Sequence, residues 1–534
     1  MRRLRAARIA PTQSRLRAAP EDPPPVQLGF VIDHSRCIGC HACTVACKSE
    51  NEVPVGSFRT WVKYTEEGTF PEVKRSFAVL RCNQCTDAPC VSICPVTAIH
   101  KRADGIVDID PEACIGCKAC MHGCPYDAIY INPDTGTAEK CHFCAHRTEL
   151  GLAPACAVVC PTEAIIPGDF EDEGSLVSRL VRDYDLTARK TEAGTGPNVF
   201  YREVAEAGID PTIPDPTSGY IWSNRVENGG VDAATWAALE EKADARTVYD
   251  VPRKMLWGGK ITGYLFTKSI AAGLFPAAWL ALGTGVAGAV RPGLIAPLLS
   301  LFFLALTGGL LVADLKRPDR FLKILLRPNW DSWLARGTFA IAAYSLLLTV
   351  WLALGLLGYE ATGAAGTALG VVTIALGALT AAYTGWLFAQ AKGRVLWMKR
   401  GYWLHLIVQA ALAGSAVLLA LQPLLEWSDP AFHRLRDVLL FALVSQILFM
   451  LAEHRMAPKG REKEYARTVH LVTHGPFATR HWILGFIVGC TAPIALLALQ
   501  AGVALAAVAG VLALVGLWVE EDVFVRAGQT LPIS

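Results

Sequence analysis

This sequence of 534 residues is poor in charged side chains and confines nearly all of its cysteines to one region. Charged residues make up 18% of the chain, against roughly 25% in typical soluble domains, and they become rare after about residue 259. Outside residues 37–160 the only cysteine is Cys490. No glycine-rich nucleotide loop follows a strand pattern, and no hydrolytic triad motif is present. The sequence therefore offers no site of its own for hydrolysis or for nucleotide-dependent chemistry.

The other sixteen cysteines form four groups of four, and each group ends in a Cys-x3-Cys pair. A cubane iron–sulfur cluster needs four thiolates, so this count suits four clusters. Three cysteines on a tight loop can reach one cube, while a fourth that precedes a proline points towards a neighbouring cube. Several clusters in one small domain predict electron transfer. The groups are Cys37/Cys40/Cys43/Cys47, Cys82/Cys85/Cys90/Cys94, Cys114/Cys117/Cys120/Cys124 and Cys141/Cys144/Cys156/Cys160.

Zinc and disulfides are the competing interpretations of these cysteines. Structural zinc sites also use Cys-x2-Cys pairs, but two separated pairs already complete a tetrahedron. Four cysteines within eleven residues, found twice, exceed that need. Disulfides are disfavoured because many of the thiols are too near in sequence to pair. Cys490 stands alone in an apolar stretch, where ordinary packing is expected.

An internal repeat supports a duplicated cluster unit. Residues 32–43 (IDHSRCIGCHAC) recur as residues 109–120 (IDPEACIGCKAC), and such self-similarity is typical of duplication. Each unit predicts a short strand, a cysteine loop and a short helix. The expected fold of this half is therefore an α+β domain that uses the pattern of a bacterial two-cluster ferredoxin twice.

Residues 29–205 resemble the four-cluster electron-transfer subunit of the dimethyl sulfoxide reductase and polysulfide reductase families. The likeness rests on the Cys-x2-Cys-x4-Cys-x3-Cys-Pro spacing of the second group, the long gap from Cys144 to Cys156, and the segment GTGPNVFY at residues 194–201. It implies that the first group pairs with the fourth and the second with the third, and that four [4Fe–4S] clusters are bound. The implied iron ligands are the sets Cys37/Cys40/Cys43/Cys160, Cys47/Cys141/Cys144/Cys156, Cys82/Cys85/Cys90/Cys124 and Cys94/Cys114/Cys117/Cys120.

Long apolar runs after residue 259 predict an all-helical membrane bundle of about eight spans. Most runs reach the ~20 apolar residues that cross a bilayer. Many are apolar on every face, unlike the amphipathic helices of a soluble protein. The expected spans are 261–283, 293–314, 338–357, 367–390, 402–422, 437–452, 482–500 and 502–519.

Basic loop residues predict how this bundle lies in an inner (cytoplasmic) membrane. The short loops on the side of the cysteine-rich domain hold sixteen Lys and Arg residues, whereas the opposite loops hold Arg291, Arg434 and Arg436. Positive charge marks the cytoplasmic side of a membrane protein, so the cluster domain is expected in the cytoplasm. Basic loops beneath a docked domain can also be interface residues. A periplasmic cluster domain, exported with a partner that carries the signal, is the alternative.

The remaining segments predict a flexible arm and a linker. The N-terminal residues hold six arginines, but no apolar core of a secretory signal follows them. The linker is polar and proline-containing, with a helical stretch near residues 232–245. The expected organisation is a basic arm over residues 1–28, the cluster domain over 29–205, a polar strap over 206–258 and the membrane domain over 259–534.

The membrane half resembles the polysulfide reductase (NrfD-type) quinone-reactive subunit. The likeness rests on YLF at 264–266, AAG at 271–273, DLKRPDRF at 314–321, HGP at 474–476 and RAGQ at 526–529. It implies a fusion of two subunits that are usually separate chains. It also implies that the cluster domain ends beside a quinone pocket.

Polar residues inside membrane helices are costly and therefore mark candidate sites. A quinone headgroup needs hydrogen-bond partners for two carbonyls and a proton donor or acceptor. Structural roles compete: a lysine could pair with a carboxylate that holds the bundle, a tyrosine could bond between helices, and Asp314 could pair with Arg317. The candidate quinone-site residues are Tyr264, Lys268, Asp314, Tyr383 and His405.

Haem binding and ion pumping are two further functions that the membrane half could have. A haem needs two axial histidines on facing helices, for which His405 and His454 are available. His470, His474 and His481 fall in a basic loop and favour surface roles, so haem is disfavoured. A redox-driven ion pump needs a chain of buried acids, and the predicted helix interiors hold almost none.

These patterns predict the electron-transfer and anchor subunit of a larger membrane oxidoreductase. The chain has no region long enough for a molybdopterin domain, so the expected partner is a molybdopterin-type catalytic subunit that exchanges electrons with the quinone pool through this chain. A hydrogenase or a multihaem cytochrome is the alternative partner. A ferredoxin merely anchored to lipid is disfavoured, because eight helices exceed that need. Apart from the basic arm, nothing favours nucleic-acid binding.

Overall fold

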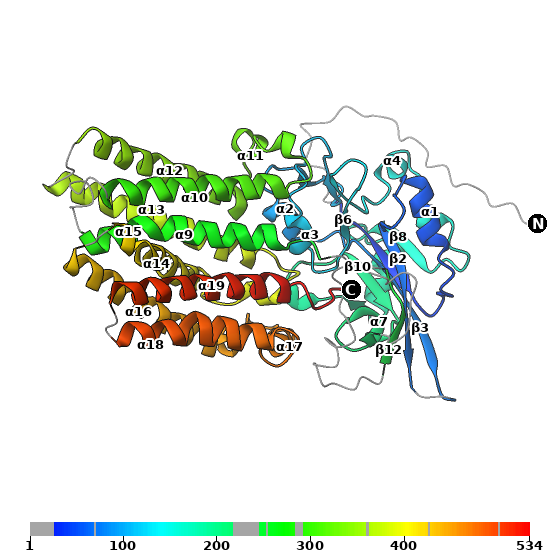
Figure 1. The fold of residues 1–534 in the computed structure, drawn as a ribbon. Helices are drawn as coiled ribbons and strands as arrows, with labels where there is room; N and C mark the ends of the chain where they lie inside the picture. The colour runs from blue at the N-terminus through cyan, green and yellow to red at the C-terminus, as the bar shows by residue number, and fades with distance from the viewer. Residues whose placement is uncertain are drawn as a thin grey trace, which may run out of the picture.

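The computed structural model describes residues 26–68, 71–216, 245–251, 255–282, 292–358, 363–425, 428–499 and 502–534. These residues form a mixed α/β domain from the N-terminal part of the chain and, beside it, a bundle of long helices from the C-terminal part (Figure 1). The expected combination of a ferredoxin-like domain with a helical membrane domain is thus confirmed. Residues 1–25 of the predicted arm, and nearly all of the predicted helix near residues 232–245, lie outside the described residues.

The central sheet of the cysteine-rich domain brings the two ends of that domain together. Strand β1 (Leu28–Asp33) pairs antiparallel with β8 (Ile165–Asp169) and parallel with β10 (Val199–Arg202), whose other edge pairs with β9 (Thr187–Ala188). The three apolar residues in the middle of β1 are fully buried, as expected for a strand covered on both faces. Because β1 leads into the first cysteine group and β8 leaves the fourth, this pairing sets the two groups side by side.

Each half of the internal repeat forms a strand, a cysteine loop and a short helix, as the sequence predicts. His41 and Lys118, at equivalent positions of the repeat, both adopt the left-handed conformation where the helix begins. The helix of the first group packs against that of the fourth, and the helix of the second against that of the third. The short helices are α1 (Ala42–Glu50), α2 (Pro89–Ile93), α3 (Ala119–Gly123), α4 (Ala145–Thr148) and α5 (Ala155–Val158). Two hairpins accompany them, β4 (Ile99–Lys101) with β5 (Val107–Ile109) and β6 (Ile129–Ile131) with β7 (Ala138–Lys140).

A second four-stranded sheet ties the strap to the cluster domain. Its order is β11 (Asp215–Pro216), β12 (Ala245–Tyr249), β2 (Thr60–Glu67) and β3 (Lys74–Arg81). Strands β11 and β12 belong to the predicted strap, and β12 pairs antiparallel with β2. The described part of the strap therefore extends a sheet of the cluster domain. Along the chain, α6 (Leu176–Asp183) lies between β8 and β9, η1 (Thr191–Ala193) between β9 and β10, and α7 (Glu206–Ile209) between β10 and β11.

Seven helices among the described residues are long and apolar enough to cross a membrane. They correspond to seven of the eight predicted spans. Short helices join them on the side of the cluster domain, including α11 (Lys323–Leu326) and α17 (Glu462–Thr473) (Figure 1). The seven are α9 (Gly259–Leu282), α10 (Pro292–Asp314), α12 (Trp333–Leu356), α13 (Gly363–Ala389), α14 (Tyr402–Ala420), η7 (Arg480–Thr491) continued by α18 (Ala492–Ala498), and α19 (Val503–Ala527).

The sixth predicted span, residues 437–452, falls in α16 (Asp429–Leu451), which is not among those seven helices. Arg434, Arg436 and Asp437 lie in its first half, so every stretch of α16 long enough to cross a membrane includes these three charges. It packs in the bundle against α14 and α9 (Figure 1). Its place in the bundle therefore resembles that of its neighbours although its composition does not.

Helix α9 is the centre of the bundle. About 72% of its apolar 18-residue stretch is buried inside the protein, against 28% for the corresponding stretch of α10 and 22% for that of α12. Helix α9 contacts α10, α13, α14, α16 and α19. Gly273 of α9 and Gly414 of α14 allow the closest approach, because a Cβ at Gly414 would lie 2.1 Å from the backbone of Gly273. Small residues at such crossings let membrane helices pack through their backbones.

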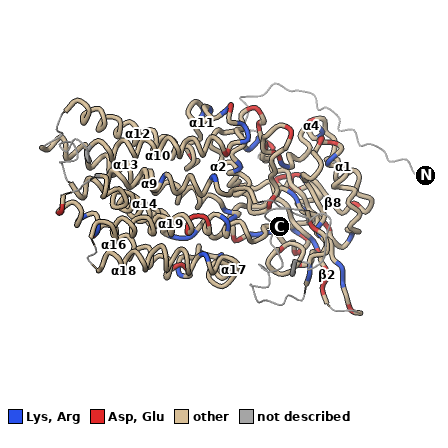
Figure 2. The backbone as a smooth tube through the Cα atoms, in the orientation of Figure 1, with Lys and Arg blue, Asp and Glu red and all other residues tan. Residues whose placement is uncertain are grey.

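Helix α19 corrects one prediction. It continues to Ala527, beyond the predicted end at residue 519, and so takes Glu520, Glu521 and Asp522 into the bundle. Their exposed fractions are 8%, 1% and 4%, and Figure 2 marks these acids on α19 near the cluster domain. The expectation that the helix interiors hold almost no acids was therefore wrong, because an acidic triplet at the end of an apolar run usually marks the exit from the membrane.

Candidate functional site

Two small cavities in the outer part of the cluster domain are each lined by four cysteines. Cys37, Cys40, Cys43 and Cys160 line one of them. The other is lined by Cys47, Cys141, Cys144 and Cys156. Each cavity joins thiols from the first and fourth cysteine groups, which the pairing of β1 with β8 has brought together.

The second and third cysteine groups meet in the same way, closer to the membrane bundle. Burial raises the pKa of Cys85 to about 12, and the nearby thiols of Cys82 and Cys124 add to the shift. Burial likewise raises the pKa of Cys117 to about 12, and the thiol of Cys94 adds to it. Iron ions fit such crowded thiols, because their positive charge favours the thiolate that burial and like charge oppose.

Buried cations separate the cysteine sets. Arg81 is fully buried, and its Nη1 donates to Cys156 Sγ at 3.2 Å. Burial opposes its charge, but the thiols of Cys156, Cys141 and Cys43 outweigh burial and raise its pKa. Lys140 is also buried, next to the thiols of Cys82 and Cys141. Arg81 therefore places a positive charge between the two outer cysteine sets. Lys140 places one between an outer set and the inner set that contains Cys82.

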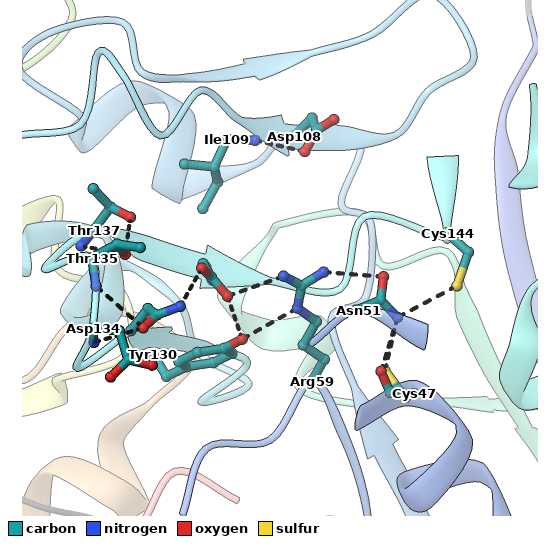
Figure 3. Close-up of polar contacts among 12 residues, drawn as sticks. Cys47, Asn51, Arg59, Asp108, Ile109, Tyr130, Asp134, Thr135, Thr137 and Cys144 are labelled. Atoms are coloured by element: carbon teal, nitrogen blue, oxygen red, sulfur yellow. Dashed lines mark hydrogen bonds and ion pairs between the residues drawn. The ribbon is translucent and has the colours of Figure 1, made fainter. Parts of the chain in front are cut away.

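A hydrogen-bond network holds the helix of the first group against the rest of the domain (Figure 3). Asn51 Nδ2 lies 3.7 Å from Cys47 Sγ and 3.8 Å from Cys144 Sγ. Arg59 donates to Asn51 Oδ1 at 3.3 Å and to Tyr130 OH at 3.2 Å. These bonds orient the amide of Asn51 towards two thiols of one set.

At the outer end of the domain, the first cysteine loop reaches solvent. Cys40 is exposed, and three apolar side chains within residues 38–55 are exposed as well. Ile38 is 58% exposed, Val45 64% and Val55 99%. Exposed apolar groups in one short segment make this end a candidate interaction surface.

At the opposite end, Cys117 lines a cavity of about 350 Å³ that extends into the membrane bundle. Helices α9, α10, α12 and α13 supply the walls, which are mostly apolar. The polar side chains in it include Tyr264, Asp314, Tyr383 and Thr384. One cavity thus touches both a cysteine of the set nearest the bundle and polar groups from membrane helices that include α9, α10 and α13.

The polar groups of the cavity are hydrogen-bonded to one another and to the cluster domain. Tyr264 OH bonds with Tyr383 OH and, at 2.8 Å, with Thr384 Oγ1. Lys118, which follows Cys117, donates from Nζ to Asp314 Oδ2 at 2.8 Å. Asp314 therefore does not form the ion pair with Arg317 that the sequence allowed. Arg317 pairs with Asp319 instead.

The predicted quinone-site residues divide into three kinds of position. Tyr264, Asp314 and Tyr383 line the cavity. Lys268 lies one hydrogen bond behind it, donating to Thr384 Oγ1 at 2.6 Å. His405 lies elsewhere, bonded to Gln446 at 2.8 Å with its ring stacked on Phe449.

The other histidines also have defined positions. His454 is exposed, whereas His405 is buried. His481 is fully buried and bonds with Glu520 at 3.2 Å, so the surface role expected from its basic loop was wrong. Thr384 could not be recognised from the sequence, because a hydroxyl in an apolar helix commonly bonds its own backbone.

Loops of the membrane half dock directly on the inner cysteine loops. Gly393 N donates to His122 O at 2.9 Å, and a Cβ there would lie 2.5 Å from the Cys124 carbonyl oxygen. Asn329 Nδ2 donates to Cys94 O at 2.8 Å. Burial lowers the pKa of His122 well below its usual value, with Arg394 adding to the shift. The cysteine set nearest the bundle is therefore held by the membrane half itself.

Several residues of the basic loops take part in this contact. Arg320 donates to Pro111 O at 2.6 Å, Lys392 to Ala193 O at 3.2 Å and Arg467 to Thr212 O at 2.8 Å. Each of these acceptors belongs to the N-terminal half of the chain. Part of the basic excess on this side is thus interface charge.

Cysteine sets that lead from an exposed loop to a cavity inside a helical bundle define a multi-pass, iron–sulfur electron-transfer protein. The chain belongs to the polysulphide reductase, NrfD, family, which matches residues 247–532. Residues 73–170 match a 4Fe-4S dicluster domain, so the cysteines belong to an iron–sulfur domain.

Known proteins similar to the N-terminal part are iron–sulfur subunits of reductases. The B subunit of tetrathionate reductase from Salmonella typhimurium is 43% identical over 198 residues, which are 36% of this chain and 79% of that protein. The B component of polysulfide reductase from Wolinella succinogenes is 38% identical over 34% of this chain and 97% of its own length. The arsenate respiratory reductase iron-sulfur subunit of a Shewanella species is 38% identical over 33% of this chain and 96% of its own length. The chain therefore joins an iron–sulfur electron-transfer subunit to an NrfD-type membrane subunit.

Proposed function

We propose that this chain passes electrons between a catalytic reductase subunit and a quinone bound in the membrane cavity. The observation that carries the proposal is the position of Cys117, which lines the same cavity as Tyr264, Asp314 and Tyr383. Direct contact between a cysteine set and a membrane cavity is what electron exchange with a lipid-soluble substrate requires. Electrons can flow in either direction, since the surroundings of a cluster set its reduction potential within a range of about −700 to +450 mV.

The sixteen cysteines would hold four [4Fe–4S] clusters, which supply one-electron transfer when bound. The two cavities lined by four thiols each support the two outer sets. The mutual influence of the thiols of Cys85 and Cys124, and of Cys117 and Cys94, supports the two inner sets. The protein's part is to bury the thiols and to place Arg81 and Lys140 between the sets.

In the cavity, the chain would bind the quinone headgroup through hydroxyl and carboxyl groups. Tyr264 and Tyr383 present phenol hydroxyls that can donate to a quinone carbonyl. Asp314, fixed by Lys118, provides a carboxyl group in the same cavity as Cys117. The apolar remainder of the wall suits a ring and a hydrocarbon tail.

The catalytic partner would dock at the exposed end, over Cys40 and the apolar residues Ile38, Val45 and Val55. A molybdopterin-type subunit is the partner we favour, because the relatives are named as subunits of tetrathionate, polysulfide and arsenate reductases. A hydrogenase or a multihaem cytochrome is the second candidate.

The membrane domain would cross the bilayer eight times, with α16 as the additional span, and keep the cluster domain in the cytoplasm. The packing of α16 against α9 and α14 supports the count. The basic loops support the cytoplasmic placement of the cluster domain. Arg320 and Arg467 are weaker support for it, because they bond the cluster domain itself. A periplasmic cluster domain is the alternative.

The test is electron exchange between the purified full chain and a short-tailed quinone. The protein, reduced by a viologen, should transfer electrons to the quinone, and iron and sulfide analysis should give four [4Fe–4S] clusters. Tyr264→Phe and Asp314→Asn should each slow quinone reduction by about tenfold or more and leave cluster content unchanged. Tyr465→Phe is the matched control, because Tyr465 is a buried tyrosine outside the cavity that donates to Glu453 O. Equal rates in all three variants would contradict the proposed site.

A further inference from the structure

The buried acids of α19 have no part in the proposed quinone site. Glu520, Glu521 and Asp522 lie on the half of the bundle that faces the cluster domain (Figure 2). None of them is among the described residues that line the cavity. Carboxyl groups inside a membrane helix are expensive, and they commonly serve the movement of protons or ions.

Asp522 is the member of the triplet that bonds with two solvent-exposed arginines. Its carboxylate accepts hydrogen bonds from Arg480 at 2.6 Å and from Arg526 at 2.8 Å. The side chains of these arginines are 41% and 39% exposed. Thr262 of α9 donates to the same carboxylate at 3.1 Å. Asp522 therefore connects the surface on the cluster side with the central helix.

Glu521 lies deeper, against the same face of α9. Ser269, two helical turns from Thr262, donates to Glu521 Oε1 at 3.2 Å. Glu521 is 1% exposed, and its second oxygen, Oε2, has no hydrogen-bond partner among the described residues. It also lies within electrostatic range of the buried ammonium of Lys268. A buried carboxyl with a free oxygen, within electrostatic range of a buried amine, can exchange a proton with it through an intervening water.

Lys268 continues the line to the cavity. Its Nζ donates to Ala381 O at 2.9 Å and to Thr384 Oγ1 at 2.6 Å. Thr384 Oγ1 in turn bonds with Tyr264 OH, which lines the cavity. The steps from Asp522 to Glu521 and from Glu521 to Lys268 are not made by direct hydrogen bonds between these side chains, and bridging waters can serve such steps.

We propose that Asp522, Glu521, Lys268 and Thr384 form a route that carries protons between the water on the cluster side and the quinone. This inference rests on the proposed function. Reduction of the quinone to quinol takes two electrons, which arrive from the cysteine sets, and two protons, which arrive by this route. Electrons and protons would reach the quinone from the same face of the membrane, so the reaction would move no net charge across it. Oxidation of a quinol would release its protons by the same route.

Glu520 provides a matched control within the same helix. It has similar burial, but its side chain bonds with His481 at 3.2 Å. It is one residue away from Glu521 and outside the route. Substitution of Glu520 by glutamine therefore makes the same chemical change at the same depth.

The experiment uses the full chain in liposomes, with a membrane-impermeant viologen as one-electron donor outside and a short-tailed quinone as acceptor. Only molecules whose cluster domain faces outward receive electrons from such a donor. The wild type should take two protons from the outer medium for each quinone reduced and generate no membrane potential. Glu521→Gln and Lys268→Met should slow quinol formation by about tenfold or more and increase its solvent isotope effect. The KM for quinone and the reduction of the clusters by viologen should stay unchanged.

Three results would overturn the route. One is proton uptake from the liposome interior with a membrane potential. Another is a rate in Glu521→Gln equal to that of Glu520→Gln. The third is a wild type that neither binds nor reduces quinone, which defeats the proposed function and the route with it. If Glu521→Gln fails to assemble its clusters, Lys268→Met and the milder Ser269→Ala decide between these outcomes.

Discussion

Buried positive charges beside the cysteine sets give single residues influence over electron transfer. The guanidinium of Arg81 bonds Cys156 Sγ and lies 4.4 Å from the centre of the Phe30 ring. The ammonium of Lys140 donates to Cys141 O at 2.9 Å. Neither side chain has water to screen it, since both are almost fully buried. A charge in such surroundings acts strongly on a neighbouring metal centre.

We therefore expect Arg81→Met to lower a cluster reduction potential. Loss of the positive charge disfavours the reduced, more negative state of the cluster held by Cys156. The shift should be about 60 mV or more, which corresponds to a tenfold change for a one-electron couple. Redox titration followed by electron paramagnetic resonance measures it.

Arg36→Met is the control for that titration. Arg36 precedes Cys37, but its side chain is 45% exposed and pairs with an exposed carboxylate of Glu163. Solvent screens such a charge, so its loss should have little effect. A shift of equal size in both variants would show that proximity alone, rather than burial, sets the effect.

Which residues could be predicted from the sequence depended on how local their chemistry is. The cysteine spacing indicates iron–sulfur loops directly, because three ligands of each set follow one another in the chain. Tyr264 and Lys268 were recognised because polar groups in apolar runs stand out. The pair Lys118–Asp314 joins residues 196 positions apart. No local pattern could indicate it, because the docking of two domains creates the contact.

Among the helices, the end of α19 shows how a pattern based on hydropathy can mislead. The acids Glu520, Glu521 and Asp522 follow a long apolar run, and charged residues usually mark the exit from a membrane. Here the helix continues, because Arg480, His481 and Ser269 supply partners for the three carboxyls. Those partners come from η7 and α9, which are distant in sequence.

The crossing of α9 and α14 should be the most sensitive contact between helices. We expect Gly414→Val to destabilise the bundle, because its Cβ would already lie 2.1 Å from the backbone of Gly273. Overpacking of this kind costs about 1–3 kcal/mol, and more where backbone blocks the way. Thermal unfolding of the detergent-solubilised protein should show a lower midpoint. Ala343→Val adds a comparable bulk on the exposed face of α12 and should leave the midpoint near that of the wild type.

At the scale of the whole molecule, the cluster domain and the bundle meet through the cysteine sets nearest the membrane. Gly393, Asn329 and Lys118 each bond across this contact within a few residues of a cysteine. The fusion of the two parts in one chain keeps this contact intramolecular, so it does not depend on the concentration of a second subunit. The cavity beside Cys117 and the acids of α19 lie on the same side of the bundle. Electron entry and the proposed proton route therefore share one face of the membrane.

The side on which this face lies can be tested by proteolysis of membrane vesicles. The cytoplasmic placement predicts that trypsin removes the cluster domain in inverted vesicles and leaves it intact in right-side-out vesicles. Exposed basic residues such as Arg36 and Arg182 offer cleavage points on the cluster domain. The opposite pattern would establish the periplasmic placement and would mean that the basic loops are retained for docking, as the bonds of Arg320 and Arg467 to the N-terminal half allow. In that case the protons of quinone reduction would be drawn from the periplasm, because the proposed route opens on the cluster side whichever way the chain lies.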